Sequence, residues 1–369
     1  MSASVLDEIC EIEKIDKSSM LSFCVKAPEH YREAVRKGEK ISLDYPKPDN
    51  IIVAGMGGSA IGGELVKDWA RGRVQVPIEV NREYSLPAYA GKKSLVMIAS
   101  YSGETEESLS AFLLAVRRGC MIYCISSGGS LIEFAKKIGV PCLIIPSGMP
   151  PRAALPYLFV PMLMSLEKLN LVSRVSESLK EALTVLKTVC GENSPEEPAK
   201  NNLSKTLAAN INETVPVVYG FGIYRSVAQR FKQQFNENSK VPSKWEIFPE
   251  LNHNEVVGWE ESGKLARNFS TIFIRDRNEP REIRSRIETT KTLLLSIRSK
   301  MFEVWSQGRN DLSKMLSAAC MGDFTSIYLA ILRKVDPTPV KTITLLKDRM
   351  KESGSKEKII RELTKIASK

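Results

Sequence analysis

Short apolar runs without polar alternation recur along the chain, and longer amphipathic segments separate them. In the first half the apolar runs cover 51–55, 76–80, 94–100, 121–126 and 142–145, with helical periodicity at 60–71, 104–118 and 131–138. Strands that are apolar at every position are buried on both faces, which is typical of a parallel sheet covered by helices. The pattern therefore predicts an α/β sandwich.

The pattern starts again in the second half. Strands are expected at 215–220, 245–248, 270–274 and 301–305, and helices at 199–210, 226–236, 281–295 and 312–332. The predicted fold class is α/β, with two parallel-sheet sandwiches in tandem and helices on both faces of each sheet. The expected division is an N-terminal helical segment (1–45), a first domain (46–190), a polar, proline-containing linker (191–200), a second domain (201–350) and a basic C-terminal tail (351–369) that forms a solvated helix or frays.

Cysteine usage and the apolar segments indicate the compartment. The seven cysteines are odd in number and none has C-x-x-C spacing, so we expect reduced thiols. The N-terminus has no apolar core of a secretory signal. The longest apolar stretch, 155–166, is too short to span a bilayer. A cytoplasmic protein without a membrane partner is predicted.

The net charge of +10 raises the question of an anionic partner. Lysines and arginines are spread along the chain, without a basic arm and without the alternation of basic and aromatic residues found in single-strand-binding proteins. We therefore expect a small anionic substrate, or simple solubility, and no nucleic acid.

A glycine-rich segment, Gly55-Met-Gly-Gly-Ser-Ala-Ile-Gly-Gly63, directly follows the first expected strand and begins a helix. Glycines let the backbone approach a ligand, and a helix N-terminus attracts anions. No Gly-Lys-Ser/Thr follows, which disfavours a nucleotide P-loop, and the dinucleotide pattern is met only loosely, with Glu79 as its acidic residue. A turn without any ligand also stays open.

A second turn, Ser100-Tyr-Ser-Gly-Glu-Thr-Glu-Glu107, follows the third expected strand and leads into the next helix. It places three hydroxyls and several amides in one strand-to-helix turn, which suits a phosphomonoester. An ordinary helix cap with a capping-box glutamate is the alternative. Open α/β sheets bind ligands at the carboxyl ends of their strands, so the two turns together favour a phosphate site.

Together the two turns resemble the sugar isomerase (SIS) domain, which binds phosphosugars. The resemblance implies that Gly58, Ser59, Ser100, Ser102 and Thr105 contact the phosphate. The family usually has Asn where this chain has a glutamate at position 104. Because a carboxylate would repel a phosphate, we expect that side chain to point away from the ligand.

Moving a proton between two carbons of a sugar needs a base, an acid that opens the ring, and a donor for the developing oxyanion. The chain has only two histidines, and His30, in an amphipathic segment, is interpreted as structural. His253 lies in a polar loop, and Glu237 lies between Asn236 and Asn238 at an expected helix end. From these residues alone, a surface glutamate and a core histidine stay open.

The combination of motifs resembles the bifunctional phosphoglucose/phosphomannose isomerases over nearly the whole chain. This resemblance implies that Glu237 shuttles the proton, that His253 opens the ring of a substrate held by the neighbouring subunit of a homodimer, and that Arg152 stabilises the enediolate. It further implies that Lys347 assists ring opening and that Thr338 is linked to mannose 6-phosphate. The implied reaction interconverts glucose 6-phosphate, and mannose 6-phosphate, with fructose 6-phosphate without cofactor or metal.

Other functions fit the sequence less well. A binding-only SIS regulator carries an N-terminal DNA-binding domain, and only about 45 residues precede the first expected strand here. An amidotransferase needs a cysteine after the initiator methionine, where this chain has Ser2; a heptose isomerase is a further alternative. A metal-dependent isomerase would need clustered histidines and carboxylates.

Overall fold

The computed structural model describes residues 3–368, which form two compact units. The first-sheet unit consists of Glu29–Glu177 and the residues from Val340 onward. The second-sheet unit consists of the residues up to Pro28 and Ser178–Pro339. This division differs from the one expected from sequence in two ways. The N-terminal residues fold with the second sheet and the C-terminal residues fold with the first sheet. The boundary between the units lies within helix α8 (Val175–Glu192) instead of at 191–200.

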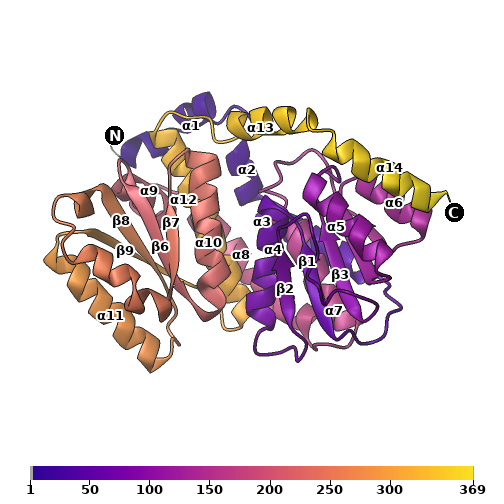
Figure 1. Cartoon of the computed structure of the whole chain (residues 1–369). Helices are drawn as coiled ribbons and strands as arrows, with labels where there is room; N and C mark the ends of the chain where they lie inside the picture. The colour runs from indigo at the N-terminus through magenta and orange to yellow at the C-terminus, as the bar shows by residue number, and fades with distance from the viewer. Residues whose placement is uncertain (1–2, 369) are drawn as a thin grey trace. The chain divides into compact units, whose positions relative to one another are not determined.

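The first-sheet unit is built on a five-stranded parallel sheet with strand order β2-β1-β3-β4-β5 (Figure 1). Its strands are β1 (Asn50–Ala54), β2 (Ile78–Asn81), β3 (Ser94–Ala99), β4 (Met121–Ser126) and β5 (Cys142–Ile144). Its helices are α3 (Ala27–Glu39), α4 (Gly57–Ala70), α5 (Glu106–Arg117), α6 (Gly129–Ile138), α7 (Leu155–Lys168), α13 (Lys341–Lys351) and α14 (Ser355–Ala367). The predicted parallel sheet is confirmed, and all six residues of β3 and of β4 are buried.

Helices cover both faces of this sheet, as predicted. Alternate residues of β1 point to opposite faces, so Ile52 shares a core with α5, α6 and α14, while Val53 lies under α4. Helix α7 packs against α4, where Gly62 allows close approach to the α7 backbone. Right-handed crossovers account for this arrangement. The connection from β1 to β2 runs toward one edge of the sheet and the connections from β3 onward run toward the other edge, so their helices lie on opposite faces.

The C-terminal residues form a docked helix instead of the solvated or frayed tail that we expected. Helix α14 packs on α5 and α6, and its Ile359 and Leu363 side chains are buried in the core of the first sheet. The two residues lie four apart and so share one helix face. The many lysines of this segment occupy the other faces, which is why composition suggested a tail.

The second-sheet unit contains a four-stranded parallel sheet with order β7-β6-β8-β9, again as predicted. Its strands are β6 (Val215–Phe221), β7 (Lys244–Phe248), β8 (Phe269–Arg275) and β9 (Lys300–Trp305). Its helices are α1 (Ile9–Ile15), α2 (Met20–Val25), α8, α9 (Leu203–Ile211), α10 (Arg225–Gln234), α11 (Arg281–Ser296) and α12 (Asp311–Leu332), with shorter turns η1 (Ala3–Asp7), η2 (Gly222–Tyr224), η3 (Phe235–Ser239), η4 (Glu250–His253), η5 (Glu255–Trp259) and η6 (Leu265–Asn268). Helix α10 packs on β6 and β7, and α11 contacts β7 and β9 from the other face (Figure 1).

Helix α12 is the central helix of the second-sheet unit. Every residue except Asp311 and Asp323 is buried, and the helix packs against α9 and α10. Its length and composition would allow it to cross a membrane, but 94% of its most apolar window is covered by the protein. Its apolar character is therefore explained by the core that it occupies.

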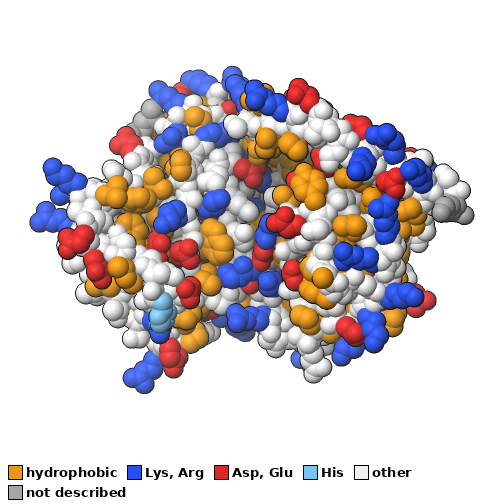
Figure 2. Space-filling view, viewed as in Figure 1, with side chains coloured by type: hydrophobic (Ala, Val, Ile, Leu, Met, Phe, Trp, Pro, Cys, Tyr) orange, Lys and Arg blue, Asp and Glu red, His pale blue; other side chains and the backbone are white. Residues whose placement is uncertain are grey.

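The positive charge is distributed over the surface. Figure 2 shows lysine and arginine side chains scattered among acidic and apolar ones over the visible face of each unit, without one dominant basic patch on that face.

Candidate active site

The glycine-rich and serine-rich turns lie side by side at the carboxyl edge of the first sheet. They follow β1 and β3, which are neighbours in the sheet, while the chain leaves β1 toward β2 on one side and β3 toward β4 on the other. This reversal of strand order is the place where open parallel sheets bind ligands. The structure thus brings together the two segments that the sequence singled out.

The glycine-rich turn is packed tightly against the segment that carries Arg152. A Cβ atom at Gly58 would lie 2.7 Å from the Pro151 carbonyl oxygen and 3.3 Å from the Arg152 Cα, so only glycine fits there. Ser59, in the first turn of α4, is buried. Arg152 is 3% exposed and lies in the turn that precedes α7. The turn and a buried cation are therefore neighbours in one unit.

The serine-rich turn holds its hydroxyls close together. The Ser100 hydroxyl donates to the Thr105 hydroxyl at 2.9 Å and accepts from the Gly103 backbone N–H at 3.2 Å. Thr105 occupies the N-cap position of α5, yet its side chain accepts no capping hydrogen bond. The helix-cap alternative therefore does not describe this turn. With its oxygen engaged by Ser100, the Thr105 hydroxyl can direct its own hydrogen toward a ligand at the helix N-terminus.

A third turn, Ser126–Ser130, follows β4 and was missed by the sequence analysis. The Ser127 N–H and hydroxyl both donate to the Tyr101 carbonyl, at 2.9 and 2.6 Å, so the third turn is bonded to the serine-rich one. Gly103 has φ +71° and lies so near Gly128 that a Cβ would come within 1.9 Å of its carbonyl oxygen. The signal was the run Ser-Ser-Gly-Gly-Ser directly after an expected strand, the same pattern as in the other two turns.

Glu104 is held by groups outside the serine-rich turn, in agreement with the expectation that it turns aside. Its Oε1 accepts from the backbone N–H and the hydroxyl of Ser130, at 2.6 and 2.9 Å, and its Oε2 is paired with Lys356 of α14. Burial, the largest influence, raises the pKa of Glu104, but the bonds from Lys356 and Ser130 together bring this pKa below its ordinary value.

Glu237 lies in η3, a short π-helical turn that continues α10. Such turns widen a helix locally and are frequent at functional sites. Lys240, which ends the turn at φ +55°, donates from its ammonium to the Glu237 carbonyl at 2.7 Å and to the Pro337 carbonyl at 2.8 Å. The segment that carries Thr338 is thus tied to the turn that carries Glu237.

Hydrogen bonds from helix α12 hold the turn that carries Glu237 in place. Its Ser326 side chain accepts from the Asn238 amide at 2.9 Å, and its Ser326 carbonyl accepts from the Ser239 hydroxyl at 2.5 Å. One turn earlier, Asp323 accepts from Arg230 of α10 at 2.7 Å. These hydrogen bonds fix the backbone around Glu237, whose side chain is half-buried and still reaches the surface.

His253 ends η4, after β7, and is exposed. The neighbouring side chains anchor its loop, since Asn252 donates to Thr290 of α11 at 2.9 Å and Glu255 accepts from Tyr219 at 3.2 Å. Within residues 3–368 the His253 ring makes no hydrogen bond or ion pair. His30, in contrast, lies 3.0 Å from the Tyr157 hydroxyl, as a structural histidine would.

Glu237 and His253 lie on either side of strand β7 along the chain. Helix α10 begins after the carboxyl end of β6 and ends near Glu237, just before β7 begins at Lys244, whereas His253 follows the carboxyl end of β7. Strand β7 has five residues. The loop after β7 is tied back to the first residue of this strand, because Glu255 pairs with Lys244 at 3.2 Å.

Lys347 lies on α13, whose residues are exposed along the entire helix.

In the first-sheet unit the structure brings Ser100, Ser102 and Thr105 together with the glycine-rich turn and Arg152. In the second-sheet unit it brings the segments of Glu237 and Thr338 together, but not His253.

The second sheet has no open equivalent of the serine-rich turn. At the reversal of its strand order, between β6 and β8, Asp276 accepts from the Tyr224 hydroxyl at 2.8 Å and pairs with Lys314 at 2.9 Å. Ser306, after β9, lies 2.7 Å from the same Tyr224 hydroxyl. All four side chains are buried, so an internal carboxylate and its partners occupy the place where a ligand would bind.

Comparison with known proteins identifies the family. The family model described as the bacterial phosphoglucose isomerase C-terminal SIS domain matches residues 200–350. A bifunctional phosphoglucose/phosphomannose isomerase of Caldicellulosiruptor bescii is 40% identical over 328 residues, covering 88% of this chain and 97% of the relative. Another, of Aquifex aeolicus, is 34% identical over 317 residues, covering 85% and 94%. The chain belongs to the bifunctional phosphoglucose/phosphomannose isomerase family.

The fold of this family member is shared more widely than its sequence. The C-terminal domain of a glucosamine-fructose-6-phosphate aminotransferase from Francisella tularensis superimposes with a TM-score of 0.67 at 15% identity, covering 87% of this chain and 98% of that domain. The predicted tandem SIS architecture is thereby confirmed. The isomerase family resemblance seen in the sequence is also confirmed, whereas the roles of individual residues stay predictions.

Proposed function

We propose that this enzyme interconverts glucose 6-phosphate and mannose 6-phosphate with fructose 6-phosphate, which makes it an intramolecular oxidoreductase. The observation that carries the proposal is the uncapped N-terminus of α5, with its paired hydroxyls, at the strand-order reversal of a chain from this isomerase family. A phosphomonoester is the ligand that such a cage of hydroxyls and free amides suits.

In the proposed reaction the Glu237 carboxylate removes the proton from C2 of the open-chain aldose and returns it to C1. The electron pair of the broken C–H bond forms the C1–C2 double bond of a cis-enediolate, whose negative oxygen is stabilised by Arg152. His253 of the neighbouring subunit and Lys347 assist opening of the sugar ring, and Thr338 contributes to turnover of mannose 6-phosphate. All steps use carboxylate, imidazole and cationic side chains, so neither cofactor nor metal is invoked.

The 6-phosphate is proposed to bind at Gly58, Ser59, Ser100, Ser102 and Thr105. Arg152 is buried beside the glycine-rich turn that this proposal assigns to the phosphate. The exposed position of His253 supports a homodimer with shared active sites. We place the enzyme in the cytoplasm, without nucleic-acid or membrane partners.

The test of this function is a coupled assay of the purified protein with each hexose 6-phosphate. We expect turnover of both substrates into fructose 6-phosphate, with equal rates before and after treatment with a chelator. Binding of phosphosugars without turnover would instead support a regulatory SIS protein. Loss of activity on chelation, restored by zinc or magnesium, would contradict the proposed chemistry.

Replacing Thr105 by Ala is expected to weaken phosphosugar binding by about 1–3 kcal/mol, because a hydrogen bond to a charged group is lost. Isothermal calorimetry should report one site per chain for the unmodified protein, since the second sheet has no open cage. Ser110→Ala is the matched control: its hydroxyl donates to the Tyr84 carbonyl at 2.7 Å further along α5. Equal affinities in Thr105→Ala and the unmodified protein would exclude this turn as the phosphate site.

A further inference from the structure

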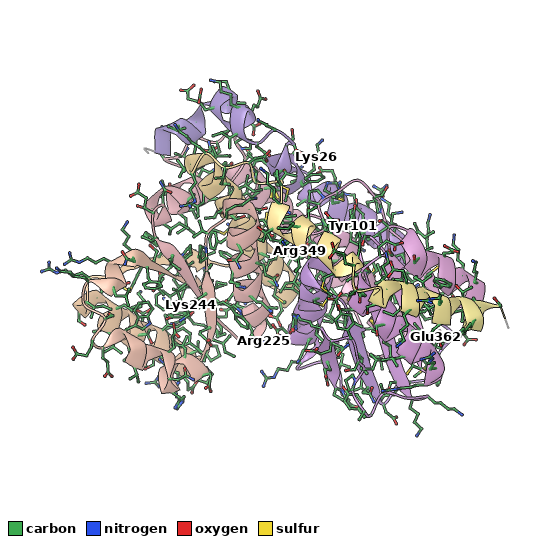
Figure 3. The ribbon with its side chains drawn as sticks, turned by 45° about the horizontal axis from the view of Figure 1, so that its top comes forward. Lys26, Tyr101, Arg225, Lys244, Arg349 and Glu362 are labelled. Atoms are coloured by element: carbon green, nitrogen blue, oxygen red, sulfur yellow. The ribbon has the colours of Figure 1, made fainter. Side chains whose placement is uncertain are left out.

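The docked C-terminal helix α14 reaches the serine-rich turn. It lies over α5 and α6, and Figure 3 labels Glu362 on its outer part. Its first turn carries Lys356, which pairs with Glu104, one residue before Thr105. The helix thus connects the end of the chain to the proposed phosphate site.

Glu104 joins two of the three turns at the sheet edge. It belongs to the serine-rich turn, and its carboxylate accepts from the backbone N–H and hydroxyl of Ser130, in the first turn of α6. The positive end of the α6 dipole therefore faces this carboxylate. This contact holds the serine-rich turn against the third turn and turns the carboxylate aside, but Glu104 directly precedes Thr105, so its negative charge stays close to the proposed anion site.

Lys356 is the side chain that offsets this charge. The Lys356 and Glu104 side chains are 31% and 40% exposed. A pair this exposed adds little to folding stability because water screens it. Its effect on a bound dianion is different, since removing the ammonium leaves the carboxylate with hydrogen-bond donors but without a cation paired to it, close to the proposed ligand.

We propose that Lys356 is a positioning residue for the substrate phosphate: it neutralises Glu104, so that this glutamate can tie the turns together without repelling the dianion. The proposal rests on the proposed function, because it takes the serine-rich turn as the phosphate site. It gives helix α14 a role in substrate affinity and none in the proton transfer.

The test is a double-mutant cycle with Lys356→Met and Glu104→Gln, read by calorimetry with glucose 6-phosphate and with inorganic phosphate, and by KM and kcat. Lys356→Met should weaken binding and raise KM about tenfold, with kcat changed less than about twofold. In the Glu104→Gln background the same replacement should change affinity less than about twofold, because no carboxylate is left to compensate.

A matched control distinguishes loss of the Lys356 charge near the phosphate from weakened docking of helix α14. Arg117 of α5 pairs with Glu362 of α14, six residues after Lys356. Arg117→Met removes an ion pair from the same interface and should leave phosphate affinity within about twofold, with melting temperatures comparable in all variants. Lys356→Arg keeps the charge and should restore affinity.

Several outcomes would overturn the proposal. They are unchanged affinity in Lys356→Met, an equal loss in the Glu104→Gln background, a loss of the same size in Arg117→Met, and an unmodified protein that binds no phosphate. A protein that binds phosphosugars without isomerising them would refute the proposed function, while the affinity cycle would still decide the role of Lys356.

Discussion

Replacing Glu237 by Gln is expected to lower kcat by at least about 100-fold with only a modest change in KM, because the amide keeps the size and hydrogen bonding of the side chain but cannot accept the substrate proton. The π-helical turn and its bonds to Ser326 should hold the variant side chain in the original place. Steady-state kinetics with both hexose 6-phosphates measure the effect.

Glu282→Gln is the matched control for this prediction. Glu282 is an exposed glutamate in the first turn of α11, and its replacement should leave kcat within about twofold. Exchange of the C2 hydrogen with solvent, followed by NMR, should be lost in Glu237→Gln alone. A kcat near that of the unmodified protein would remove Glu237 from the role of base.

The sheets could be predicted because their signal is local. A strand buried on both faces is apolar at every position, so β4, for example, was predicted with the bounds that the structure shows. The glycine-rich and serine-rich turns were found for a similar reason, since the backbone and hydroxyl requirements of a phosphate cage fall within about eight consecutive residues.

Features that depend on distant segments were not predictable in this way. The docking of α14 requires knowing that Leu363 meets the core of the first sheet. The Tyr224, Asp276 and Lys314 cluster is assembled from three separate segments, so no sequence window shows that the second sheet is closed to a ligand. The expected linker, 191–200, does not mark the unit boundary because it is packed into the second-sheet unit. Lys205 donates to the carbonyls of Pro195 and Glu197, and Tyr328 of α12 donates to the carbonyl of Asn193.

The position of His253 leads to the second prediction. In the proposed function each active site takes Glu237 from one subunit and His253 from the other. A two-fold symmetric dimer makes both sites equivalent. Homodimers of Glu237→Gln and of His253→Ala should therefore both be poor enzymes, and a heterodimer of the two should contain one site with both lesions and one site with none.

Co-expression with two different tags gives the heterodimer, whose activity should approach about half that of the unmodified dimer. The reciprocal heterodimer is the control: one chain carries both replacements and the other none, so every shared site has one lesion and activity should stay at background. If His253 acted within its own subunit, the two results would exchange, because the separated lesions would damage both sites and the combined lesions only one. Half activity in the reciprocal heterodimer would therefore place His253 in the same site as its own Glu237, and background activity in both would show that the two sites of a dimer do not work independently.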